Sequence, residues 1–150
     1  MQKRAAGTGA LLVLLAALLP ARADSDSDRL IQAGMIGTWT FDCNAFPSQA
    51  NPHITYAPSL RGSPTRTVLI GASGVLPAEL VTQVESIADD RISLAQTSRN
   101  GSTVRLILLV RGNRHRSLQS IDSDGRVLVK DGRFIKDGSE TRWLTRCDPR

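Results

Sequence analysis

The sequence has few of the residues that enzymes and nucleic-acid-binding proteins use at their sites. Its 150 residues include two histidines, two cysteines, two tryptophans, one tyrosine and three phenylalanines. So few aromatic side chains leave little from which to build a base-stacking surface. Neither His53 nor His115 stands in a recognisable nucleophile motif, and nothing in the sequence has the spacing of a metal site. We therefore expect a non-enzymatic protein without cofactor, metal or nucleic-acid partner.

Long apolar runs are also scarce. The longest, residues 10–19, is too short to span a bilayer as a helix, which needs about 20 apolar residues. It follows Lys3 and Arg4 and precedes the small-residue pattern Ala21-Arg22-Ala23. This order is typical of a secretory signal peptide, so we predict that residues 1–23 are cleaved and that the protein is periplasmic or secreted. The alternative is that the apolar run forms a buried helix of the fold.

Charge indicates little about a partner once this segment is removed. The whole chain carries a formal charge of +5, but three of its 19 basic residues lie in residues 1–23. The remaining 16 basic side chains nearly balance 14 acidic ones. The remaining chain, residues 24–150, is long enough for one domain with a core and too short for two.

The two cysteines, Cys43 and Cys147, permit one intramolecular pairing. Export to an oxidising compartment favours a disulfide, which would connect two distant parts of the chain. In the chain-entropy model a loop of this length contributes up to roughly 4.7 kcal/mol of stability. The alternative is two free or intermolecular thiols.

Turn signals dominate the second half of the chain. Asn100-Gly101 separates two alternating apolar stretches and predicts a tight hairpin of type I′. Further two-residue turn signals follow at Gly112-Asn113, Asp124-Gly125, Asp131-Gly132 and Asp137-Gly138. Short strands at this spacing indicate an antiparallel meander.

Two segments are less clear. Residues 77–88 have apolar residues at helical spacing but are rich in β-branched side chains, and we favour a strand because a hairpin series follows. Residues 24–36 are interpreted as an acidic linker, mobile at Asp24–Asp28, with a short helix capped by Ser27 or Asp28.

The two ends of the predicted domain mirror each other. Gly37–Cys43 and Thr141–Cys147 each place a tryptophan four residues before a cysteine. A disulfide at these positions would hold the first strand beside the last and remove both exposed sheet edges. We therefore predict an all-β fold: an up-and-down meander closing into a small barrel of seven to nine strands over residues 37–147, with a short tail, 148–150.

The opening Gly37-Thr38-Trp39 after a short helical turn resembles the start of lipocalins and related calycin barrels. The resemblance implies that Trp39 plugs one end of the barrel and that a last-strand arginine, Arg142 or Arg146, packs across it. Small exported metalloprotease inhibitors are similar as well, since they combine this motif with an eight-stranded barrel and one disulfide.

The resemblance concerns the architecture and leaves three functional classes open, of which we favour a monomeric, non-enzymatic carrier of a small apolar or lipid-like ligand. Candidate ligand-binding residues are Trp39, Phe41, Tyr56 and Trp143. One alternative is a protein-binding module, such as an inhibitor of an envelope or secreted hydrolase, acting through a loop or the segment 24–30. Another is an envelope accessory protein recognised only by its surface.

One dense basic cluster stands out in the second half. Arg111, Arg114, His115 and Arg116 are candidates for contact with an anionic surface, with Arg105 nearby across a hairpin. The alternative is a solvated turn. Asp122-Ser-Asp-Gly125 resembles the start of a calcium loop, but no glutamate follows at the required position, and we interpret it as a turn.

The signal-peptide interpretation predicts the mass of the exported protein. Mass spectrometry of protein recovered from the periplasm or medium should give the mass of residues 24–150, because signal peptidase cleaves after small-x-small patterns. An exported protein that retains Met1 would contradict this prediction.

Overall fold

The computed structural model describes residues 25–59 and 62–147. The predicted signal peptide and the predicted tail, 148–150, lie outside the described residues. The described residues form one helix and ten strands, which are α1 (Asp26–Gln32), β1 (Gly37–Thr40), β2 (His53–Ala57), β3 (Thr65–Leu69), β4 (Val75–Ala88), β5 (Arg91–Thr97), β6 (Thr103–Arg111), β7 (Arg114–Ile121), β8 (Val127–Lys130), β9 (Arg133–Phe134) and β10 (Leu144–Cys147).

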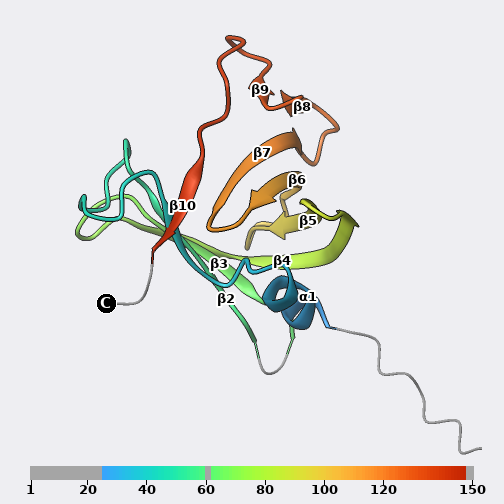
Figure 1. The fold of residues 1–150 in the computed structure, drawn as a ribbon, viewed down its shortest axis with the longest axis horizontal. Helices are drawn as coiled ribbons and strands as arrows, with labels where there is room; N and C mark the ends of the chain where they lie inside the picture. Colours follow the sequence, from blue (N-terminus) through green and yellow to red (C-terminus); the bar gives the residue numbers. More distant parts are fainter. Residues whose placement is uncertain (1–24, 60–61, 148–150) are drawn as a thin grey trace, which may run out of the picture.

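The strands form one antiparallel sheet that closes on itself. From β1 to β7 each strand pairs with the next along the chain. β10 then pairs with β1, placing Cys147 opposite Thr38, and with β7, placing Leu144 opposite His115. Within the described residues this gives a closed eight-stranded barrel, with β8 and β9 forming a hairpin outside the ring (Figure 1). The predicted fold class is confirmed.

The predicted disulfide is also confirmed. Cys43 follows β1 and Cys147 ends β10, and their Cα atoms lie 5.6 Å apart. The two cysteines come together because β1 and β10 are neighbours in the barrel. The bridge therefore ties the first strand to the last across the point where the ring closes.

The hairpins occur where the turn signals lie, but one predicted turn type is wrong. Asp131 and Gly132 both have positive φ, +52° and +74°, which is the pattern of a type I′ turn between β8 and β9. At the predicted type I′ site only Gly101 has positive φ. There the loop is longer, with Ser98 N donating to Ser102 O and Gly101 N to Ser98 O.

β4 confirms the strand interpretation of residues 77–88. Its pairing with β5 shifts register between Thr82 and Glu85, and Gln83 within this bulge has a φ of +54°. A bulge bends its strand and frees backbone groups from the ladder. The groups freed here are those of Val84, which find partners on α1: Asp26 Oδ1 accepts from the amide at 2.9 Å and Arg29 Nη1 donates to the carbonyl at 2.8 Å.

α1 begins earlier than the sequence predicts. Its N-cap is Ser25, whose hydroxyl accepts from the Asp28 amide while Asp28 Oδ2 accepts from the Ser25 amide. The predicted caps, Ser27 and Asp28, are instead inside the helix, and Ser27 is buried and hydrogen-bonded to Ser59. From Ser25 onward the segment expected to be mobile is a capped helix attached to the barrel, because the two Val84 contacts hold it.

The core lies inside the barrel and under α1. Its buried members are Leu30, Met35, Trp39, Tyr56, Val81, Val84, Ile92, Leu94, Leu108 and Leu144. Trp39 is fully buried, and its Nε1 donates to Met35 O at 2.8 Å.

Arg146, one of the two arginines that the lipocalin resemblance offers, lies over the Trp39 ring with its Cζ 5.9 Å from the centroid. Its Nη1 also donates to Gly34 O at 3.2 Å. Gly37 suits this position because its φ is +124°, a backbone conformation that residues with a side chain rarely adopt.

The disulfide predicts a loss of stability on its removal. The Cys43→Ala/Cys147→Ala variant should unfold with a free energy about 3–5 kcal/mol lower, because the unfolded chain regains the entropy of a long open loop. Urea denaturation monitored by tryptophan fluorescence measures the difference, with reduced wild type as the control. Equal stability of the oxidised and reduced proteins would contradict the prediction.

Candidate ligand-binding cleft

The barrel closes over a short distance between β7 and β10. Only two residue pairs join these strands, Leu144 with His115 and Thr145 with Arg114. Farther along, β7 pairs with β8, as in Ser120 opposite Val129. The chain between β8 and β10 must therefore pass beside the unpaired part of β7.

Two hydrogen bonds attach this connecting segment to β7. The Gly132 amide donates to Leu118 O at 2.9 Å, and Thr141 Oγ1 donates to Ser117 O at 2.7 Å. The β8–β9 hairpin consequently stands against the barrel wall at the β7–β10 seam, at the opposite end of the molecule from α1 (Figure 1).

A cavity of about 260 Å³ lies between the hairpin and the barrel wall. This volume is slightly below the usual range for ligand pockets, roughly 300–1,000 Å³, and suits only a small ligand. We call it the seam cleft; its lining is mainly apolar and consists of Phe41, Leu106, Arg116, Ser117, Ser120, Leu128, Val129, Phe134, Thr141, Arg142 and Leu144.

A second, more open hollow of about 560 Å³ lies on the hairpin itself. It is lined by Arg126, Val127, Leu128, Phe134, Ile135 and Lys136. Leu128 and Phe134 line both spaces, so the seam cleft and the outer hollow share a wall. The seam cleft and the outer hollow are therefore adjacent, and the same β8–β9 hairpin contributes an apolar wall to each.

Two cationic side chains line the seam cleft. The guanidinium of Arg142 stacks on Phe41, with Cζ 3.6 Å from the ring centroid. Arg116 Nη1 lies 3.7 Å from Glu140 Oε2, while its Nε is buried and has no hydrogen-bond partner among the described residues. An anionic group at the cleft could therefore accept from Arg142 and would also be attracted by the positive charge of Arg116.

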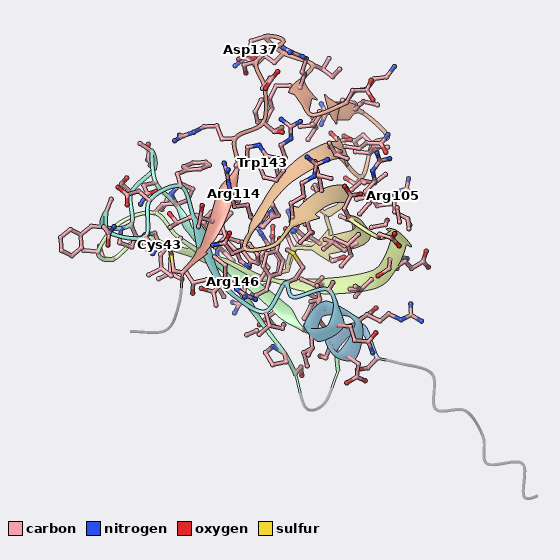
Figure 2. All side chains as sticks on the ribbon, viewed as in Figure 1. Cys43, Arg105, Arg114, Asp137, Trp143 and Arg146 are labelled. Atoms are coloured by element: carbon pink, nitrogen blue, oxygen red, sulfur yellow. A yellow bond between two sulfur atoms is a disulfide. The ribbon has the colours of Figure 1, made fainter. Side chains whose placement is uncertain are left out.

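The four predicted ligand-binding residues fall into three different places. Phe41 lines the seam cleft. Trp39 and Tyr56 are 0% and 3% exposed and pack in the core. Trp143 lies outside the barrel, where the guanidinium carbons of Arg114 and Arg116 each lie 5.1 Å from its ring centroid (Figure 2).

The predicted basic cluster is divided by the strand. Arg114 is exposed on the outer face, whereas His115 points into the barrel and is 3% exposed. Arg111 lies 3.5 Å from Asp90 in an ion pair. The expectation that Arg105 is nearby is wrong, because it pairs with Ile121 at the other end of β6 and lies well apart from Arg114 (Figure 2).

His115 is a buried polar residue of the barrel interior. Its ring contacts Trp39 edge-on, with centroids 4.6 Å apart, and neither ring nitrogen has a hydrogen-bond partner among the described residues. Burial, with a smaller contribution from the nearby Arg66 guanidinium, lowers the pKa of His115 to about 4. The imidazole is therefore neutral at pH 7.

The neighbouring polar groups are paired. Gln96 Nε2 donates to the Tyr56 hydroxyl at 3.1 Å, and burial raises the pKa of that hydroxyl. Arg66 Nη1 lies 2.6 Å from Glu79 Oε2. These residues, which sequence reasoning left out apart from Tyr56, form a polar layer inside the barrel next to His115.

Sequence reasoning also missed the hairpin side of the cleft. Val127-Leu128-Val129 and Phe134-Ile135 are the relevant apolar residues, and in the sequence they look like any pair of hairpin strands. The signal that could have placed His115 is simple: strand alternation puts it on the face opposite Arg114 and Arg116.

No family model matches the chain, and neither the curated proteins nor the solved structures that were searched include a match. In residues 25–59 and 62–147 no group of three or more His, Cys, Asp or Glu side chains is arranged to hold a metal ion. None of the helices in that part of the chain has the length and hydropathy to cross a membrane. Asp122–Gly125 forms the predicted turn, in which Asp122 accepts from the Asp124 and Arg126 amides.

His115 predicts a specific pH dependence. Since its folded-state pKa is lowered, the unfolded chain binds the proton first. The contribution of His115 to the free energy of unfolding is fully present above about pH 6.5. It falls by roughly 3 kcal/mol as the pH drops to about 4. Urea denaturation between pH 7 and pH 4 should show this slope in wild type and a flatter one in His115→Phe. The same slope in both proteins would assign it to another group.

Proposed function

We propose that the protein is an exported, non-enzymatic binding protein that carries a small lipid-like ligand in the seam cleft. The observation that supports this most is the composition of the cleft wall. Barrel residues Phe41, Leu106 and Leu144 face hairpin residues Leu128 and Phe134 across the cavity. Enclosing an alkyl chain between these side chains removes apolar surface from water on both sides.

The charges at the cleft favour an anionic ligand. Both ionisable side chains in the lining, Arg116 and Arg142, are cationic. Arg142 forms no ion pair with any described residue, and the Arg116 Nε–H lacks an acceptor. A carboxylate or phosphate head group beside them would accept from the Arg142 guanidinium while its chain lies against Phe134. The proposed ligand class is therefore an anionic amphiphile with one short chain.

Export is proposed on two grounds. The Cys43–Cys147 disulfide suits an oxidising compartment such as the periplasm or extracellular space, and residues 1–23 have the pattern of a signal peptide. A small carrier fits both locations. The alternative of an inhibitor that acts through the 24–30 segment is less well supported, because Asp26 and Arg29 are engaged with β4.

A paired substitution tests the cleft. Leu128→Asp should weaken binding of anilinonaphthalene sulfonate and of dodecanoate by about ten- to a hundredfold, because it places a charge in the apolar wall and removes the leucine side chain that a bound alkyl chain would contact. Probe fluorescence and its displacement by dodecanoate measure this.

Leu76→Asp is the matched control. Leu76 lies on β4 and is 44% exposed, and Leu128 is 43% exposed. The control should bind as wild type does, and dodecanol should displace the probe more weakly than dodecanoate. Equal losses in both variants, or no binding to wild type, would contradict the carrier proposal.

A further inference from the structure

The β8–β9 hairpin and the residue that follows it expose four large apolar side chains that lie together. The exposed fractions are 39% for Val127, 43% for Leu128, 43% for Phe134 and 59% for Ile135. All four line the outer hollow, so they form one continuous surface. We call this surface the hairpin face. Contiguous apolar surface of this kind is typical of an interaction site.

Residues 122–140 carry four basic and five acidic side chains, and the four basic ones lie beside the hairpin face. Arg126 and Lys136 line the same hollow, and Lys130 and Arg133 flank the turn between β8 and β9. Arg126 is paired with Asp122 and Asp124, and Arg133 with Glu140.

The two lysines are different from the arginines. Among residues 25–59 and 62–147, neither Lys130 nor Lys136 has a carboxylate at ion-pair distance, and both are exposed. Each is followed in the chain by an exposed aspartate, Asp131 or Asp137, that lies beyond ion-pair distance, so both ammonium groups are free to meet an anionic group beside the exposed valine, leucine, isoleucine and phenylalanine. The combination selects a partner that is apolar inside and anionic at its surface.

We propose that the hairpin face docks on an anionic phospholipid bilayer. Val127, Leu128, Phe134 and Ile135 enter the headgroup region, and Lys130 and Lys136 lie at the level of the phosphates. The shape suits this role, because the hairpin projects from the barrel on the side away from α1 and can meet a flat surface without the barrel intervening (Figure 1). Apolar insertion and attraction to anionic lipid act together in such interfacial binding.

Docking would also bring the seam cleft to the membrane. Leu128 and Phe134 form the wall between the outer hollow and the cleft, so a lipid chain leaving the bilayer needs to pass only these two side chains. This last step rests on the proposed carrier function. The docking itself does not, since it requires only the hairpin face and its lysines.

The test is cosedimentation with vesicles. Wild type should bind vesicles of phosphatidylcholine mixed with phosphatidylglycerol, bind pure phosphatidylcholine at least about tenfold more weakly, and dissociate at high salt. Lys130→Glu/Lys136→Glu should weaken binding to the mixed vesicles by at least about twentyfold, since each lysine near an anionic surface contributes roughly fivefold. Arg91→Glu/Arg99→Glu, which changes the charge equally on β5 and its loop, is the control and should have a much smaller effect.

A second pair of variants tests the apolar part. Val127 and Ile135 line the outer hollow and are not part of the seam-cleft lining. Val127→Ser/Ile135→Ser should therefore weaken vesicle binding about tenfold or more while dodecanoate binding is unchanged. Val75→Ser/Ile87→Ser is the matched control, with 61% and 48% exposed side chains on β4. Thermal unfolding checks that each variant is folded.

The docking proposal would be overturned if wild type bound no vesicles or bound neutral vesicles equally well. It would also be overturned if the hairpin and control variants lost vesicle binding equally. A further contradicting result is a loss of vesicle binding caused by Arg111→Glu/Arg114→Glu but not by the hairpin variants. That last result would assign lipid binding to the β6–β7 turn. The carrier proposal fails separately, through the Leu128→Asp comparison, so the two failures are distinguishable.

Discussion

The pairing of β10 with both β1 and β7 is the contact on which the rest of the structure depends. Without it, β1 and β7 would be the exposed edges of an open sheet, with their backbone groups unpaired. β10 is only four residues long, and two of its residues pair with β7. The disulfide compensates for this short contact by linking Cys147 to Cys43 beyond β1.

β10, which closes the barrel, also contributes side chains to the core. Arg146 of β10 covers the Trp39 ring, and Leu144 packs in the core and lines the seam cleft. Its neighbour across the seam is His115, whose ring contacts Trp39. Closure of the barrel, packing around Trp39 and the shape of the cleft are therefore consequences of one arrangement of β1, β7 and β10.

The brevity of the β7–β10 pairing explains where the cleft lies. The unpaired part of β7 needs hydrogen-bond partners, and β8, the Gly132 amide and Thr141 provide them. Because these partners lie outside the ring of barrel strands, the apolar β8–β9 hairpin lies there too. The barrel wall covers Phe134 and Leu128 on only one side. The barrel interior near Trp39 and Tyr56 is packed with side chains, and the apolar cavity proposed for a ligand lies instead at the seam.

Much of the fold could be predicted from the sequence because it depends on local chemistry. Alternating apolar residues and glycine-containing turns predict the meander, and two cysteines permit one pairing. The turn type at Asn100-Gly101 could not be predicted in this way. A turn must also match the register of both flanking strands, and here a longer loop fits.

The candidate site was predicted less well, because its residues come from separate parts of the chain. Of the proposed ligand contacts only Phe41 lines the cleft; its partners Leu128 and Phe134 meet it across the seam after more than 80 intervening residues, at a distance set by strand order. Which arginine packs over the Trp39 ring, Arg146 and not Arg142, also depends on which strands become neighbours. The same is true of the burial of His115. By itself the sequence determined the elements, their turns and the disulfide, since these follow from short-range preferences and a cysteine count. Only the tertiary structure decided the cleft and the hairpin face, because both arise from register and closure, which involve the whole ring at once.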